Sequence, residues 1–225
     1  MYARRIEGDK DRPPSILLSI EDVTERKADI RHQELMIGEL SHRVKNTLAV
    51  VQSIASQSRR GSKTLDEFGL AFDGRLGALA SANDLVISGN WKKVDLRHLV
   101  DRALRPFAQS GQFMIFDGPP VDLLPQSSLT VAMILHELAT NATKYGALST
   151  KAGTVSIGWR VEKSGTMLHL CFDWAESGGP TVIAPKKQGQ GTRFIERSIM
   201  YELKGSIDLN YAADGMRALL QIPLA

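Results

Sequence analysis

The segment Leu40–Thr47 contains the residue of this chain best suited to covalent chemistry, His42. Apolar residues recur around it on helical spacing, namely Ile37, Leu40, Val44, Leu48, Val51 and Ile54. The same spacing puts His42 on the opposite, polar face of the helix, with Glu39 and Asn46. A neutral imidazole has a free lone pair at about pH 7, so His42 can accept a group transferred from a molecule docked beside it. An ordinary surface histidine is the alternative.

Residues 136–146 contain a second set of polar side chains, in which Glu137 and Asn141 stand four residues apart. That spacing puts both on one face of a predicted helix, with Lys144 and Tyr145 one turn further on. A carboxylate and an amide oxygen one turn apart can hold a hydrated magnesium ion, which takes few protein oxygens besides waters and substrate phosphates. A solvated helix with an internal hydrogen bond is the alternative.

A predicted strand, Leu168–Trp174, leads into an acid and two glycines, Glu176, Gly178 and Gly179. Backbone without side chains lets a planar ligand approach closely, and a carboxylate there can accept a hydrogen bond from an exocyclic amine. The motif therefore indicates a ligand edge, although a tight turn has the same composition.

Gly189 and Gly191 precede a helical pattern that continues from Thr192. Glycines that open a helix leave backbone N–H groups available for phosphate, and the helix dipole favours an anion there. A bare Gly-x-Gly is weak evidence when it stands alone.

In this order and spacing the four segments resemble sensor histidine kinases of the HWE type, from about Arg26 to the C-terminus. The features that name the subfamily are a histidine in the magnesium-binding helix and a Trp-x-Glu further on. They correspond here to His136 and to Trp174-Ala175-Glu176. Residues 136–149 and 191–205 are also similar to that family almost residue for residue.

The resemblance implies that His42 is the phosphoacceptor and that Asn141 coordinates magnesium, with Glu137 helping to activate or polarise. It also implies that Glu176 meets the adenine amine and that Gly189 and Gly191 end a short ATP lid. The residues it assigns to binding of ATP and Mg²⁺ are Asn141, Glu137, Lys144, Tyr145, Glu176, Gly178, Gly189, Gly191, Thr192, His136 and Trp174.

Arg43 departs from better-known histidine kinases, which carry an acid directly after the phosphoacceptor. A guanidinium stays protonated and cannot take a proton from imidazole. Glu39 and Glu137 are therefore the candidate bases. Asn46, four residues after His42, could orient the ring or position a water in the reverse reaction.

Composition agrees with a globular domain plus a helical module, since 43% of the 225 residues are hydrophobic and 24% are charged. A net charge of +3, with cations scattered among acids, argues against a nucleic-acid partner. The single cysteine, Cys171, favours a reducing, cytoplasmic compartment. Ser15–Ile20 is too short for a membrane span.

These residues must be positioned by a helical hairpin and a sheet. A helix is predicted from about Glu21 through His42 to residue 60, and another over 65–86. Residues 27–88 are therefore expected to pair with a second copy in a four-helix bundle. A monomer whose apolar stripe packs on the ATP-binding part is the alternative.

Residues 1–26 are predicted to be the remnant of a PAS-like sensor domain, because Asp22–Arg26 resembles the exit from such a domain. Residues 27–90 form the hairpin and residues 91–225 the ATP-binding domain. The fold class is α+β, with the hairpin followed by a two-layer α/β sandwich of the Bergerat ATP-binding type. Its sheet is expected to be antiparallel or mixed, with helices over 95–108, 126–145 and from 191.

The predicted function is autophosphorylation of His42 from Mg-ATP, followed by transfer to an aspartate of a response regulator. The alternatives are a degenerate kinase that only docks a response regulator and a Bergerat-fold ATPase without a phosphoacceptor.

Overall fold

The computed structural model describes residues 2–6, 15–19, 24–88, 93–107, 113–115, 118–184 and 189–224. The described chain forms two compact units, Met1–Gln52 and Ser53–Ala225. The division at residues 90 and 91 between hairpin and ATP-binding domain stays a prediction.

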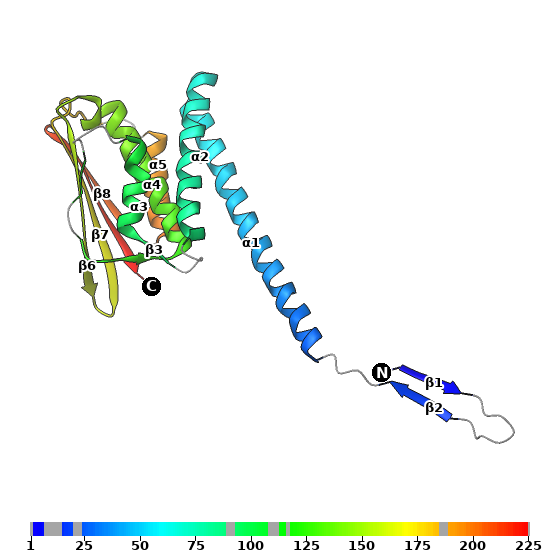
Figure 1. Cartoon of the computed structure of the whole chain (residues 1–225). Helices are drawn as coiled ribbons and strands as arrows, with labels where there is room; N and C mark the ends of the chain where they lie inside the picture. The colour runs from blue at the N-terminus through cyan, green and yellow to red at the C-terminus, as the bar shows by residue number, and fades with distance from the viewer. Residues whose placement is uncertain are drawn as a thin grey trace. The chain divides into compact units, whose positions relative to one another are not determined.

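The first unit contains a two-stranded antiparallel hairpin and most of a long helix (Figure 1). Strands β1 (Tyr2–Ile6) and β2 (Ser15–Ser19) pair with each other, and α1 (Thr24–Gly61) follows. The sequence predicted the second strand and the helix. It missed β1, because Arg4 and Arg5 interrupt any apolar alternation.

In the second unit the end of α1 turns at residues 62–64 into α2 (Leu65–Ser88), as predicted. The turn is capped locally. Thr64 accepts a hydrogen bond from the Glu67 N–H at 3.2 Å, and the Glu67 carboxylate accepts one from the Lys63 N–H at 2.7 Å. These bonds satisfy N–H groups that have no partner within a helix.

The sheet of the second unit has five strands, in the order β4-β6-β7-β9-β8. They are β4 (Phe113–Ile115), β6 (Thr154–Ser164), β7 (Met167–Ser177), β8 (Ser206–Ala212) and β9 (Gly215–Leu224). β4 and β6 pair in parallel and the other neighbours are antiparallel, so the sheet is mixed. Gly165, at a φ of +60°, makes the turn between β6 and β7.

Helices cover one face of this sheet (Figure 1). They are α3 (Leu96–Leu104), α4 (Pro125–Tyr145) and α5 (Gln190–Arg197), with short helices η1 (Arg105–Phe107), η2 (Ala147–Ser149) and η3 (Ser198–Glu202). This two-layer arrangement, preceded by the helical hairpin, confirms the α+β fold class.

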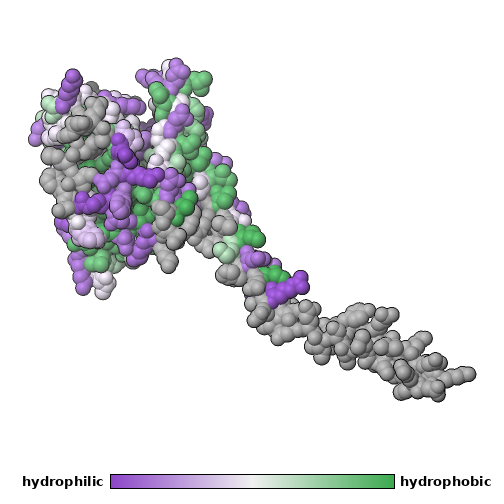
Figure 2. Space-filling view, in the orientation of Figure 1, coloured by the Kyte–Doolittle hydropathy of each residue, from purple (hydrophilic) through white to green (hydrophobic). Residues whose placement is uncertain are grey.

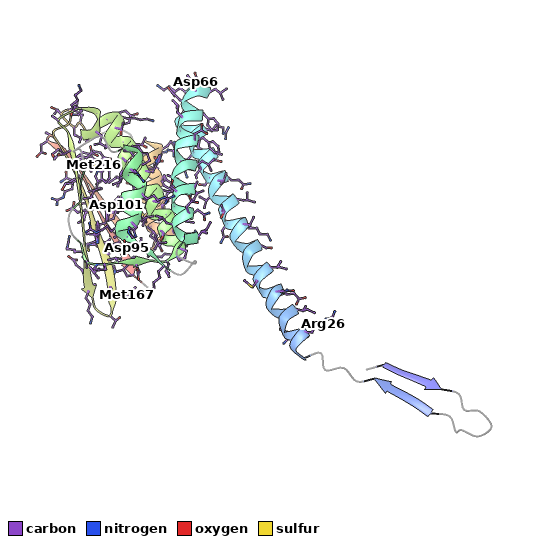
Figure 3. All side chains as sticks on the ribbon, in the orientation of Figure 1. Arg26, Asp66, Asp95, Asp101, Met167 and Met216 are labelled. Atoms are coloured by element: carbon purple, nitrogen blue, oxygen red, sulfur yellow. The ribbon has the colours of Figure 1, made fainter. Side chains whose placement is uncertain are left out.

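A two-residue strand pair, missed from the sequence, fixes the start of α3. β3 (Val94–Asp95) pairs with β5 (Asp122–Leu123). The side chain of Asp95, labelled in Figure 3, then accepts a hydrogen bond from the His98 N–H at 2.9 Å and caps the helix.

The core lies between the sheet and the helices, where Phe172, Trp174 and Ile134 are at most 2% exposed. Ala82 and Val86 of α2 join the same apolar cluster. The second hairpin helix is therefore part of the body that contains α4. No helix within the described residues is long and apolar enough to cross a bilayer.

Candidate functional site

Helix α4 carries Glu137 and Asn141 one turn apart, as the sequence predicted. Glu137 is only 3% exposed, whereas Asn141 is half-buried. A nearly buried carboxylate needs partners, because an ionised group loses its hydration when it leaves water.

Gly191, in the first turn of α5, lies directly against these two side chains. A Cβ added at Gly191 would stand 2.6 Å from Glu137 Oε2 and 3.7 Å from Asn141 Nδ2. Only glycine fits there without displacing the carboxylate. Gly189 is the N-cap residue of α5, so the backbone N–H groups of its first turn have no partner within the helix. Carboxylate, amide and helix N-terminus therefore converge.

Glu176 occupies a second buried position, at the end of β7, and is 7% exposed. Its carboxylate accepts hydrogen bonds from the Ala147 N–H at 2.9 Å and from the Trp174 indole N–H at 3.2 Å. Burial raises the pKa of Glu176 above its ordinary value, and the two N–H bonds oppose that rise.

Three glycines near Glu176 make close contacts, and one of them lies against its carboxylate. A Cβ at Gly146 would fall 1.9 Å from Glu176 Oε2, and one at Gly179 would fall 2.8 Å from the Ala147 Cα atom. Gly178 adopts a φ of +70°, in the left-handed region that favours glycine. Gly146 therefore lies directly against the carboxylate, whereas Gly178 and Gly179 pack on neighbouring backbone.

His136, the other residue that names the HWE subfamily, lies on a different side of α4. Its ring meets the Phe107 ring edge-on, with centroids 5.3 Å apart, and a Cβ at Gly74 of α2 would be 3.3 Å from it. Burial lowers the pKa of His136, and the positive charges of Arg75 and Lys144 act in the same direction, against Glu137. Trp174 thus contacts Glu176, whereas His136 contacts α2.

Arg75 of α2 is the partner of Glu137, and no sequence motif indicated this pairing. Its Nε donates to Glu137 Oε1 at 2.5 Å and one terminal nitrogen donates to Oε2 at 3.0 Å. The other terminal nitrogen donates to the Ser58 hydroxyl of α1 at 2.9 Å, and Ser58 is fully buried. Gly74 and Arg75 stand within the apolar stripe of α2, where a glycine or an arginine is unfavourable without a specific contact. These two residues were the available signals of a contact here.

The remaining predicted nucleotide residues lie at the edges of the region. Lys144 and Tyr145 end α4 and are exposed, the latter by 75%. Thr192 is half-buried in the first turn of α5.

His42 lies in the part of α1 that belongs to the first unit. The side chains of His42, Arg43 and Glu39 fall outside the described part of the structure. Asn46 is exposed on the same helix. The roles of these four residues stay predictions.

The donor set fits a hydrated magnesium ion bound with a nucleotide. Glu137 and Asn141 supply a carboxylate and an amide beside a helix N-terminus, which suits Mg²⁺ because it keeps waters and takes phosphate oxygens. Within the described residues no cluster of three or more His, Cys, Asp or Glu side chains gathers to hold a metal by itself.

Comparison with known proteins places these features in context. Residues 39–120 match the HWE histidine kinase family. A blue-light-activated histidine kinase of Brucella ovis is 38% identical over 205 residues, or 90% of this chain, and that of Brucella anthropi is 36% identical over 204. The chain spans 42% of the length of these relatives.

Two solved structures share the fold. The histidine kinase domain of the Erythrobacter litoralis EL346 blue-light-activated kinase gives a TM-score of 0.55 at 17% identity, covering 89% of this chain and 94% of that one. The longer EL346 structure gives 0.52 at 19% identity, covering 94% of this chain and 64% of its own.

Proposed function

Because the chain belongs to the HWE histidine kinase family, we propose that it transfers the γ-phosphoryl group of Mg-ATP to its own His42. The observation that carries this proposal is the convergence of Glu137, Asn141 and Gly191 at the start of α5. Phosphoryl transfer asks mainly for position and compensation of negative charge, and this arrangement offers both.

Each group in the second unit has a task in this proposal. Asn141 and Glu137 hold the magnesium ion, which when bound neutralises charge on the phosphates. The N–H groups after Gly191 bind phosphate oxygens. The Glu176 carboxylate accepts a hydrogen bond from the adenine amine, and Lys144 adds a cation at the edge of the region.

The chemical step forms a nitrogen–phosphorus bond on His42. A ring nitrogen attacks the γ-phosphorus with its lone pair, the bond to the bridging oxygen breaks, and ADP leaves. The proton on the other ring nitrogen must then depart. Arg43 cannot take it, so Glu39 or Glu137 is the proposed acceptor.

Asn46 is proposed to orient the His42 ring, or to position a water during dephosphorylation. We expect Asn46→Ala to lower the rate of at least one of these two reactions. Equal rates for wild type and variant in both would remove Asn46 from the mechanism.

The phosphoryl group then passes to an aspartate of a response regulator. The input signal arrives through α1 from a PAS-like module that ends near residue 26.

We also propose a homodimer through residues 27–88, because α1 exposes apolar residues of its predicted stripe. Ile37 is 63% exposed, Val44 56% and Leu48 57%. Figure 2 shows hydrophobic surface at several places along the long helix.

Incubation with ATP labelled on the γ-phosphate tests the proposal. We expect label on the wild type with magnesium, and none without magnesium or in Asn141→Ala. Asn210→Ala is the matched control, because Asn210 is an exposed asparagine of β8 outside the site. Equal labelling of the wild type and Asn141→Ala would overturn the assigned site.

A further inference from the structure

A chain of three side chains links the hairpin to the candidate site. Ser58 of α1 is bonded to Arg75 of α2, and both oxygens of Glu137 on α4 are bonded to Arg75. Arg75 is 12% exposed and Glu137 3%, so water competes little with the pair. A bidentate guanidinium fixes both the position and the plane of a carboxylate.

The pair is built into the body of the second unit. On the same helix as Arg75, Leu79 is 5% exposed, Ala82 2% and Val86 1%. Ala82 and Val86 belong to the apolar cluster that includes Leu135 and Leu138 of α4. Arg75 is therefore held next to α4 by packing that does not depend on the ion pair.

The turn of the hairpin also approaches the start of α5. A Cβ at Gly61 would lie 3.8 Å from the side chain of Gln190, which follows the N-cap of α5. Gly191 also lies against Glu137 and leaves just enough room for Oε2. The carboxylate is thus in contact with both a guanidinium from the hairpin and the backbone that opens α5.

We propose that Arg75 is a positioning residue for the kinase reaction: it orients the Glu137 carboxylate toward the magnesium and phosphate end of the site. The inference rests on the proposed function, and it assigns to the hairpin a task besides carrying the phosphoacceptor. Without Arg75 the buried carboxylate would lose both bonds that fix its rotamer and the charged side chain that donates them.

Steady-state autophosphorylation by the full chain tests this assignment. Partners that orient a metal-binding side chain are typically worth about 10- to 100-fold in activity, so we expect Arg75→Met to lower kcat by about that factor while the ATP KM changes less than about threefold. Arg75→Lys should recover part of kcat, since it restores the positive charge but not the planar pair of N–H donors. Ser58→Ala should give a smaller loss of the same kind.

Two controls separate positioning from general damage. Arg102→Ala removes another arginine that contacts α2, through Asp84 at 3.1 Å, but on the surface and away from Glu137. It should leave kcat unchanged. In a Glu137→Gln background Arg75→Met should cause no further loss, because Arg75 acts through that carboxylate. Equal losses in both backgrounds, or an Arg75→Met variant as active as the wild type or more active, would overturn the inference.

A binding measurement keeps this inference separate from the proposed function. We expect the magnesium concentration that half-saturates binding of a fluorescent ATP analogue to rise about tenfold in Arg75→Met, with thermal unfolding used to confirm that the variant is folded. Absence of label on the wild type would contradict the kinase proposal, and this titration would still decide on Arg75. An unchanged magnesium requirement would reject the positioning role.

Discussion

At the scale of single residues, the two buried carboxylates near α4 differ in their hydrogen-bond partners. Glu137 has a guanidinium, and Glu176 has two neutral N–H donors. A guanidinium fixes the position and the plane of a carboxylate, whereas a carboxylate held by neutral N–H donors can also accept a hydrogen bond from an uncharged amine. This difference agrees with the separate roles proposed for the phosphate and adenine ends.

Gly191 offers a direct test of the packing at the phosphate end. We expect Gly191→Ala to lower autophosphorylation at least tenfold, because the new Cβ would stand 2.6 Å from Glu137 Oε2 and the carboxylate would have to move. Gly189→Ala meets nothing within 4 Å and should cost less. Initial rates of labelling compare the two. A larger loss for Gly189→Ala would contradict the geometry.

His136 should make the folded state sensitive to acid. Burial lowers its pKa below the ordinary 6.5, so between that value and the folded pKa the unfolded chain binds more protons. Stability contributed by the neutral ring is therefore present above pH 6.5 and is lost as the pH falls below it.

We accordingly expect His136→Gln to flatten the acid side of the stability profile, measured by urea unfolding between about pH 7.5 and 5. The same substitution at His98, which is exposed on α3, is the control. An unchanged slope in His136→Gln would show that this ring does not carry the effect.

At the scale of elements, α2 and α4 meet where Gly74 faces His136. We expect Gly74→Leu to destabilise the fold by about 1–3 kcal/mol, because a large side chain would force the helices apart. Gly77→Leu, on the same helix with nothing within 4 Å, should stabilise by up to about 1 kcal/mol through helix propensity. Chemical denaturation measures both. Destabilisation by both substitutions alike would contradict this contact.

Periodicity was enough to predict α4 and the strands β6 and β7, because long elements with one buried face repeat their apolar residues. It was not enough for β1 or for the two-residue pair of β3 and β5. The first lacks alternation, and the others are too short for a period to register. Glu137, Asn141 and Gly191 were predicted to share a site because they lie in recognisable motifs.

The pairing of Arg75 with Glu137 could not be predicted, since 62 residues separate the two and no local pattern joins them. The same holds for the contact of His136 with Gly74. Such contacts depend on how α2 packs against α4. The sequence pattern did not decide whether the hairpin packs on the ATP-binding part or on a second copy.

At the scale of the whole molecule, the two hairpin helices differ in burial. Leu79, Ala82 and Val86 of α2 are buried, whereas Val44 and Leu48 of α1 are exposed. We expect a dimer whose dissociation constant rises at least tenfold in Leu48→Glu, because burying one such side chain stabilises an interface by about 1.5–3 kcal/mol.

Sedimentation velocity over a concentration series gives that dissociation constant. Lys45→Glu, on the polar face of the same helix, is the control. A wild-type chain that remains monomeric throughout would contradict the proposed dimer.

His42 is the proposed acceptor of the phosphoryl group, and mapping the label tests this proposal. We predict an acid-labile, alkali-stable label on the wild type that is absent from His42→Ala, while both proteins bind Mg-ATP equally well. Label that persists in His42→Ala, or ATP binding without any label on the wild type, would contradict it and favour a nucleotide-dependent docking protein or ATPase.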